Sequence, residues 1–184
     1  MFAGWFSPSF PTQDRVWLDA AACTRGLQRD VTRALQDDGD AVLVLLRGAT
    51  EVADMARVLD GLSPKVCDDR YAAADLQPHL TGAGALGITR VEALRPLPPA
   101  EARAIPLQVH VRGRGDRRSD DHRLLEGLKA WAPASIVFHH GLDDRLLREN
   151  VTSVKPLLAR RGVGADDAVS SPLIDRAIQR MQRP

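Results

Sequence analysis

The segment 41–46 reads AVLVLL, a run of apolar residues that no polar residue interrupts. A strand with one face in water alternates apolar and polar side chains, so this run predicts a strand that is covered on both faces. Such strands are typical of a parallel sheet that carries helices on both sides. The run therefore favours an α/β fold.

Short apolar runs alternate with longer amphipathic segments along most of the chain, as expected of a parallel sheet covered by helices. We predict strands at 16–18, 41–46, 65–67, 86–89, 107–111 and 135–138. We predict helices at 19–38, 50–61, 71–80, 119–131, 143–161 with a break at Pro156, and 172–182. The expected fold is therefore a mostly parallel sheet of about six strands with helices on both faces.

Capping residues and prolines place several of these boundaries. Asp19 can cap the first helix, and Ser119 or Asp120 can cap the fourth, because their side chains accept hydrogen bonds from free amides. Pro172 occupies an early helical position where its missing N–H costs nothing, so it indicates a helix start. Prolines rule out regular structure over much of 94–106, which we predict to be a loop.

Composition limits the number of domains and the classes of partner. A chain of 184 residues with 44% hydrophobic content can bury one core but is too short for two full domains. The formal net charge is +1, so no overall field attracts nucleic acid or an anionic membrane. Cys23 and Cys67 form neither a metal motif nor a disulfide framework, which favours a reducing, cytoplasmic setting. We expect no nucleic-acid partner and no stable membrane insertion.

The N-terminus is apolar but carries no early positive charge and reaches polar sequence too soon for a signal peptide or a membrane span. We expect an arm that packs through Trp5, Phe6 and Phe10. The predicted organisation is an arm at 1–13 and a single domain at 14–184, in which 171–182 form a C-terminal helix.

An arginine cluster follows the fifth predicted strand. Arginines next to glycines can bind phosphate, because glycine lets the backbone approach and arginine makes forked contacts. The candidate phosphate-binding residues are Arg112, Arg114, Arg117 and Arg118. The alternative, which we favour, is a solvated turn whose charges are neutralised by Asp116, Asp120 and Asp121.

Four residues after the last predicted strand have side chains of the kinds that bind divalent metals: His139, His140, Asp143 and Asp144. Adjacent residues on a strand point to opposite faces, so only one of the two histidines could join a given site. We favour the alternative in which Asp143 caps a helix. No metal ligand is assigned, and a metal-dependent hydrolase is retained as the competing enzymatic interpretation.

The C-terminal helix carries an apolar stripe at helical spacing. This stripe either folds back onto the domain or faces a partner. The candidate partner-binding residues are Leu173, Ile174, Ile178 and Met181. Neither cysteine has a base within sequence reach, so we expect both to be small packing residues.

Several strings follow one another along residues 12–182. They are DRVWLDAAACTRGLQRDVTRALQDDGDAVLVLLRGATEVADMARVL, AGALGIT, the stretch from RRSDDH to LDDRLLR, and SSPLIDRAIQRMQ. Together and in this order, they resemble the second RecA-like motor domain of the SecA family, the ATPases that drive proteins through the bacterial Sec channel. The resemblance implies a RecA-like fold of the helicase C-terminal type.

The same resemblance places substitutions at the family's catalytic positions. In the family, one RecA-like domain supplies a phosphate loop and the second supplies arginines that stabilise the transferring phosphoryl group. This chain has no GxxxxGK[ST] motif and no segment that resembles the first motor domain, and RVEALRPLPP lacks the glycines and the acid of the matching family motif. His122 takes the place of the motif glutamine, and Glu126 and Lys129 take the places of the arginine fingers. A carboxylate there repels a γ-phosphate, so the resemblance implies a degenerate motor domain that does not hydrolyse ATP.

From these observations we expect a pseudoenzyme that acts as a protein-interaction or adaptor module, without a cofactor, and that is linked to protein export. The expected partner is an authentic SecA, another export component, or a second copy of the chain. Two alternatives stay open. One is a nucleotide-binding regulatory domain without hydrolysis, and the other is the metal-dependent hydrolase described above.

Overall fold

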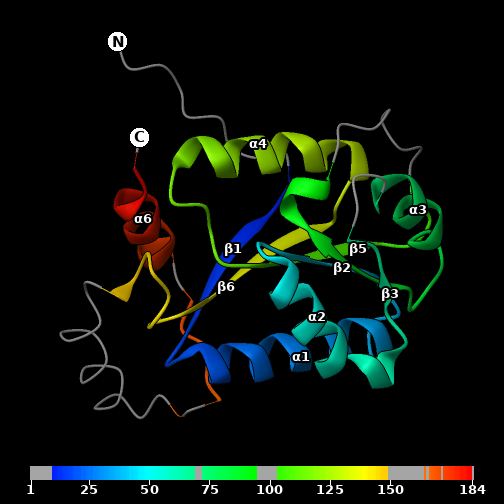
Figure 1. Cartoon of the computed structure of the whole chain (residues 1–184), viewed down its shortest axis with the longest axis horizontal. Coiled ribbons are helices and arrows are strands. Elements are labelled where there is room, and N and C mark those ends of the chain that lie inside the picture. The colour runs from blue at the N-terminus through cyan, green and yellow to red at the C-terminus, as the bar shows by residue number, and fades with distance from the viewer. Residues whose placement is uncertain are drawn as a thin grey trace.

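The computed structural model describes residues 10–68, 72–94, 103–148, 164, 166–170 and 172–183, apart from the side chains of 72–74 and 173. Its centre is a sheet of six strands in the order β1-β6-β5-β2-β4-β3, and every neighbouring pair is parallel (Figure 1). The strands are β1 (Thr12–Trp17), β2 (Ala41–Leu46), β3 (Lys65–Val66), β4 (Leu86–Arg90), β5 (Leu107–Arg112) and β6 (Ser135–Gly141). The predicted fold class is confirmed.

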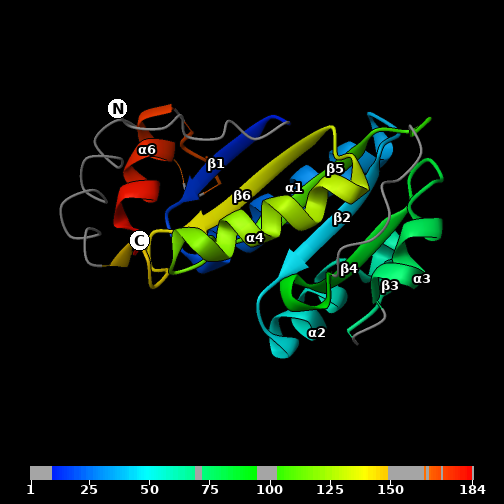
Figure 2. The same ribbon diagram turned by 90° about the horizontal axis from the view of Figure 1, so that it is seen from above.

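Helices cover both faces of this sheet. Figure 2 shows α1 and α2 on one face, α4 on the other, and α6 beside the β1 edge. The helices are α1 (Ala20–Gln36), α2 (Ala49–Val58), α3 (Ala72–His79), α4 (Arg118–Leu128) and α6 (Pro172–Met181). Short 3-10 turns, η1 (Asp60–Leu62), η2 (Val91–Ala93) and η3 (Lys129–Trp131), follow α2, β4 and α4. Among the described residues, none of the helices combines the length and the apolar character that crossing a membrane requires.

Two hydrophobic cores lie on opposite faces of the sheet because side chains alternate along each strand. Leu43 and Leu45 of β2 face a core shared with α3, α4 and η3, whereas Val42 and Val44 face a core shared with α1 and α2. Every residue of β2 is buried. The uninterrupted apolar run is thus explained, since β2 is central and needs an apolar side chain on each face.

The first strand is longer than predicted and begins inside the expected arm. Thr12 of β1 is already paired with Ile136 of β6, and Asp14 lies within the strand and is fully buried. The charge of Asp14 obscured the strand in the sequence, because a lone aspartate disfavours a buried strand unless partners neutralise it. Phe10 is buried in the core as expected. Trp5 and Phe6 lie outside the described residues.

The first and fourth helices test the predicted caps. The Asp19 side chain accepts a hydrogen bond from the backbone amide of Ala22, as predicted. The prediction for the fourth helix is wrong, because α4 begins at Arg118 with Arg117 as its N-cap residue. Ser119 and Asp120 therefore lie in its first turn, and Asp120 favours the helix there through its charge rather than as a cap.

The helix predicted from Asp143 does not begin there. The residues after β6 form turns up to Leu147. In these turns the Asp144 carboxylate accepts hydrogen bonds from the Gly141 amide and from Arg112. Pro156 and the rest of that predicted helix lie outside the described residues. The last helix is confirmed as α6.

Candidate functional site

The carboxyl ends of the parallel strands form the edge where ligands usually bind in α/β domains, at points where successive connections leave on opposite faces of the sheet. β2 is such a point, because it leads into α2 on one face while its neighbour β5 leads into α4 on the other. Two pockets of about 210 and 450 Å³ lie beside this point. Arg47, which directly follows β2, lines both of them.

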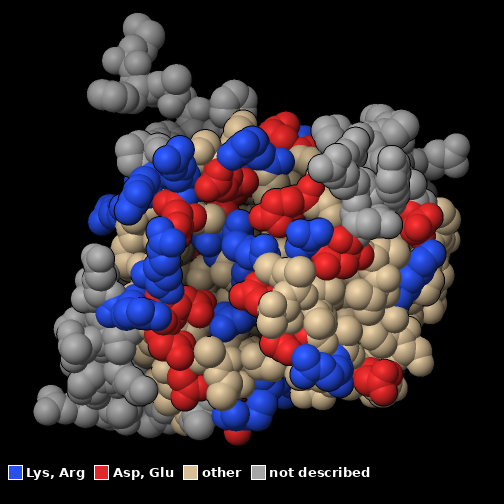
Figure 3. Space-filling view, in the orientation of Figure 1, with Lys and Arg blue, Asp and Glu red and all other residues tan. Residues whose placement is uncertain are grey.

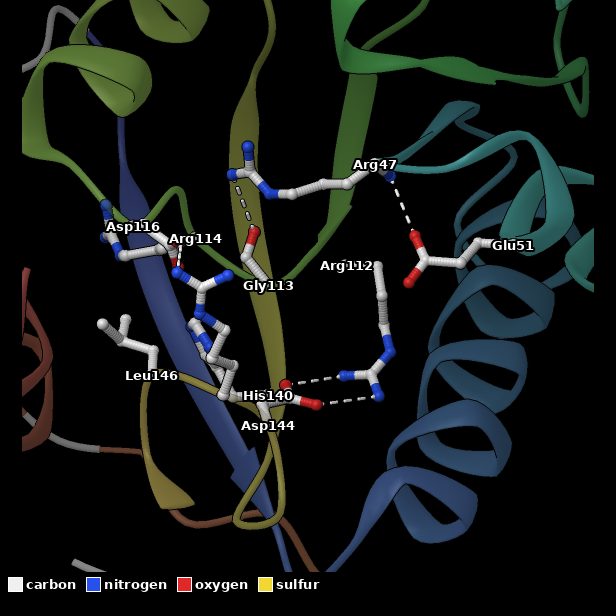
Figure 4. A pocket seen from close by; sticks show the side chains of 10 residues that line it. Arg47, Glu51, Arg112, Gly113, Arg114, Asp116, His140, Asp144 and Leu146 are labelled. Atoms are coloured by element: carbon white, nitrogen blue, oxygen red, sulfur yellow. Dashed lines mark hydrogen bonds and ion pairs between the residues drawn. The ribbon is translucent and has the colours of Figure 1, made fainter. Parts of the chain in front are cut away.

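Arg112 at the end of β5 is neutralised by one carboxylate. Its two terminal nitrogens donate to the two oxygens of Asp144 at 3.0 and 3.2 Å (Figure 4). Only 13% of the Arg112 side chain is exposed. A forked pair of this kind uses the two N–H groups on one edge of the guanidinium that would otherwise bind a phosphate.

Arg114 is neutralised by two carboxylates and is more deeply buried. It donates to both oxygens of Asp14 at 2.7 and 2.8 Å and to Asp121 at 3.0 Å. The guanidinium also lies over the Phe138 ring, 4.0 Å from its centre. Burial alone would lower the pKa of Arg114, but its hydrogen bond and charge interaction with Asp14, together with Asp121, raise it. This side chain is therefore a fixed cation.

Asp14 and Asp121 are each held by further donors. Asp14 accepts from His140 Nε2 at 2.8 Å. Burial alone would raise the pKa of Asp14, but the hydrogen bonds from His140 and Arg114 outweigh it and lower the pKa. Asp121 accepts from the Gly115 amide and from Gln182 Nε2, both at 2.7 Å. Both carboxylates thus belong to one buried polar network.

The four candidate phosphate-binding arginines do not form one cluster. Arg112 and Arg114 line the smaller pocket, whereas Arg117 is exposed at the start of α4 and Arg118 donates to the Gln179 carbonyl at 2.9 Å. The charges of Arg112 and Arg114 are neutralised, and Asp121 is the one predicted acid that takes part. The acids that pair with the two pocket arginines are Asp14, Asp121 and Asp144, while Asp116 pairs with Arg145 and Asp120 pairs with Arg123.

The positions that resemble the family's glutamine and arginine fingers lie on the solvent side of α4 and at the start of η3. His122, Glu126 and Lys129 are all exposed. Lys129 Nζ and Glu126 Oε1 form an ion pair at 2.7 Å, and the hydrogen bond from Lys129 lowers the pKa of Glu126. None of the three lines either pocket.

The two adjacent histidines point to opposite faces of the sheet. His140 donates to Asp14 as described, while His139 stacks on Trp17 and shares a hydrogen bond of 3.0 Å with His110. Burial lowers the pKa of His110 to about 3 and lowers that of His139 as well. Asp143 is exposed in a turn. Within the described part of the chain, no three His, Cys, Asp or Glu side chains are placed to hold one metal ion, so the geometry gives the metal-site alternative no support.

The apolar stripe of α6 packs onto its own domain. Ile178 is 1% exposed and forms a small core with Val16, Leu142 and Leu147. Ile174 and Met181 pack against the same core, and the Leu173 side chain lies outside the described residues. Ile174, Ile178 and Met181 therefore do not form an open docking surface.

Sequence patterns missed three of the residues that define this site: Asp14, Arg47 and Gln182. Their side-chain partners lie far away in the sequence, and Arg114 and Asp14 are 100 positions apart. Asp121, by contrast, is among the acids that the sequence predicted to neutralise the arginines. The available signal was a charged residue inside or beside an apolar strand pattern, which requires a neutralising partner if the strand is buried.

Comparisons with known proteins bear on the fold. No protein-family model matches the chain, and no curated protein matches it significantly. Its structure is similar to the crystal structure of the C-terminal part of the Fun30 ATPase domain, with a TM-score of 0.52 and 13% sequence identity. The similarity covers 86% of this chain and 52% of that one, so the chain spans about half its length. The domain thus has the predicted RecA-like α/β fold, which it shares with that part of the Fun30 ATPase domain.

Proposed function

We propose that this domain is a non-catalytic, SecA-like motor domain that serves as a protein-interaction or adaptor module in protein export. The assignment to SecA is supported by the order of the similar strings along residues 12–182. The RecA-like fold agrees with it, because that fold is implied by the same resemblance.

The observation that carries the non-catalytic proposal is the neutralisation of the arginines at the carboxyl edge of the sheet. Phosphoryl transfer needs cationic groups that are free to stabilise negative charge on the transferring group. Arg112 and Arg114 instead bind carboxylates in forked geometry. Glu126 of α4 and Lys129 of η3 neutralise one another on the solvent side.

Releasing Arg114 for catalysis would be costly. Asp14 is fully buried and the Arg114 side chain is only 6% exposed. Separating them leaves the buried Asp14 carboxylate with His140 in place of a permanent cation. Removing one partner of such a buried pair typically costs about 3–5 kcal/mol. A nucleotide would have to supply that free energy before gaining any contact, so we infer that the pair is structural.

The described surface predicts a mainly polar contact with a partner. Among the described residues, Val66 is the only large hydrophobic side chain that is substantially exposed, at 43%. Figure 3 shows basic and acidic side chains interleaved on the face that contains the pocket. Such a surface suits a regulated or reversible contact with SecA, another export component or a second copy better than an obligate apolar interface.

An ATPase assay and a direct binding measurement test this proposal together. Purified protein with ATP and Mg²⁺ should release no phosphate above a blank. Biolayer interferometry with purified SecA, and sedimentation of the chain alone, should detect either the SecA complex or a dimer. Phosphate release that disappears in an Arg112→Gln variant, but not in Arg57→Gln on the exposed face of α2, would overturn the proposal.

Nucleotide binding without hydrolysis is a second candidate. It is favoured by the position of the 210 Å³ pocket at the carboxyl edge and by its four lining arginines, Arg47, Arg112, Arg114 and Arg145. If nucleotide binds, ATP or ADP should raise the melting temperature in proportion to the logarithm of its concentration. A melting temperature that does not respond to either nucleotide would favour the interaction module.

A further inference from the structure

Arg47 occupies a central position at the carboxyl edge. It follows the central strand β2 and reaches across the sheet edge toward Gly113, between the two pockets (Figure 4). The Arg47 side chain is 27% exposed, compared with 13% for Arg112 and 6% for Arg114. Of these three arginines, Arg47 is therefore the one that a ligand can reach most easily.

The hydrogen bonding of Arg47 is incomplete. One terminal nitrogen donates to the Gly113 carbonyl at 3.2 Å and to Asp121 at 3.3 Å, both long contacts. Its Nε–H is buried and has no partner among the described residues. A buried donor without an acceptor is unfavourable, so the arrangement favours a ligand that brings an acceptor and turns the guanidinium toward it. Arg112 and Arg114, by contrast, are each saturated by a forked carboxylate.

The surroundings of Arg47 favour a carboxylate over a phosphate. A carboxylate accepts two parallel hydrogen bonds from the Nε and Nη groups of one guanidinium. Glu51 lines the smaller pocket, and Glu92 and Asp120 line the larger one, where Asp120 is paired with Arg123. These acids repel a doubly charged phosphate more strongly than a singly charged carboxylate.

The larger pocket also offers apolar contact beside Arg47. Val91, Leu94 and Leu124 line it, and the first two are only partly buried. An arginine side chain beside apolar surface in a pocket is the kind of site that contributes most of the binding free energy at protein interfaces. We propose that Arg47 anchors the partner by binding an acidic side chain that is flanked by an apolar one. This inference rests on the proposed function and specifies the chemistry of its partner.

Nuclear magnetic resonance of the arginine Nε–H groups in the full chain tests the inference directly. The probes are N-acetyl-Leu-Glu-amide, its Leu-Gln counterpart, and inorganic phosphate. The Arg47 Nε–H resonance should shift saturably with the Glu peptide and should not shift with the Gln peptide. Arg47→Lys should weaken binding of the Glu peptide by about tenfold, because lysine lacks the forked geometry. Arg57→Lys, at an exposed arginine on α2, should leave it unchanged.

Three results would overturn the inference. They are no shift with the Glu peptide, equal shifts with both peptides, and a larger shift with phosphate than with the Glu peptide. The resonance is observed in the unmodified protein, so the first measurement does not depend on whether a variant folds. Absence of ATP turnover with no peptide response would leave the proposed function in place and remove only the role of Arg47.

Discussion

Acid should destabilise this domain well before its carboxylates titrate, because two histidines are buried together beneath α1. His110 and His139 share one hydrogen bond, and the other ring nitrogen of each is buried without a partner in the described structure. Among the described residues, neither ring has an acidic hydrogen-bond partner that would stabilise a positive charge. Protonating either ring in the folded state therefore places an unpaired charge in the interior.

The size of the effect follows from the pKa of His110, which burial lowers from its ordinary 6.5 to about 3. The folded pKa lies below the unfolded one, so the unfolded chain binds more protons, and stability falls as the pH drops from 6.5 toward 3. Between about pH 7.5 and pH 5, His110 alone should lower the free energy of unfolding by about 2 kcal/mol. His139 adds to this loss in the same direction, since its pKa is also lowered.

The carboxylate network acts at lower pH and does not obscure the effect. The pKa of Asp14 is lowered from its ordinary 3.8, so its contribution is complete above that value and is lost only as the pH falls further. Burial raises the pKa of Asp175, which therefore acts in the opposite direction as the pH falls. Comparison with a His110→Leu variant, rather than the pH interval alone, isolates the histidine contribution.

Urea denaturation followed by tryptophan fluorescence at about pH 7.5 and pH 5 measures this difference, which corresponds to roughly 4–8 °C in melting temperature for a chain of this size. His110→Leu should reduce the pH dependence whatever its own stability. His122→Gln, at an exposed position on α4, should retain it. A free energy of unfolding that is equal at both pH values, or an undiminished slope in His110→Leu, would refute the reasoning.

Three further predictions concern packing, the buried ion pair and the thiols. Gly26→Ala should lower the free energy of unfolding by about 1–3 kcal/mol, because the new methyl group meets the Trp17 ring. Gly127→Ala should not lower it, because its new methyl group meets open space. Equal urea midpoints for the two variants would contradict this. Asp14→Asn should cost about 3–5 kcal/mol, because it weakens the neutralisation of buried Arg114, while Asp54→Asn in an exposed pair should cost no more than about 1 kcal/mol. Comparable losses in urea denaturation would contradict the structural role of Asp14. Burial raises the pKa of Cys23 to about 12, so a thiol reagent near neutral pH should modify half-buried Cys67 and reach Cys23 only in denaturant. Rapid modification of both thiols in the native protein would be the contrary result.

Local patterns predicted most of the fold because they report directly on burial. The apolar run of β2, the Asp19 cap and the helix start at Pro172 each act within a few residues, so the sequence contains the whole signal. The length of β1 could not be read in the same way. Its Asp14 is tolerated only because Arg114 and His140, both distant in sequence, converge on it.

The candidate site was less predictable for the same reason. Strand alternation correctly separated His139 from His140, since that depends on neighbouring residues alone. The partners of the arginines depend on which loops meet at the carboxyl edge. Spacing suggested Asp116, Asp120 and Asp121 for that role, and Asp121 does pair with Arg114. The fold supplies the other two acids, Asp14 from β1 and Asp144 from the turn after β6, in place of Asp116 and Asp120.

The neutralised arginines and the docked C-terminal helix are parts of one structure. Gln182, just after α6, donates to Asp121 and to the Gly115 carbonyl, and Asp175 of α6 accepts from the Asp14 amide. The C-terminal segment thus orients one of the two carboxylates that hold Arg114, that of Asp121, and binds the backbone of the residue that supplies the other, Asp14. Hydrogen bonds in such a network reinforce one another in a low-dielectric interior. A substitution that freed Arg114 would therefore also loosen α6, so restoring a free arginine at this edge requires rebuilding the network rather than changing one residue.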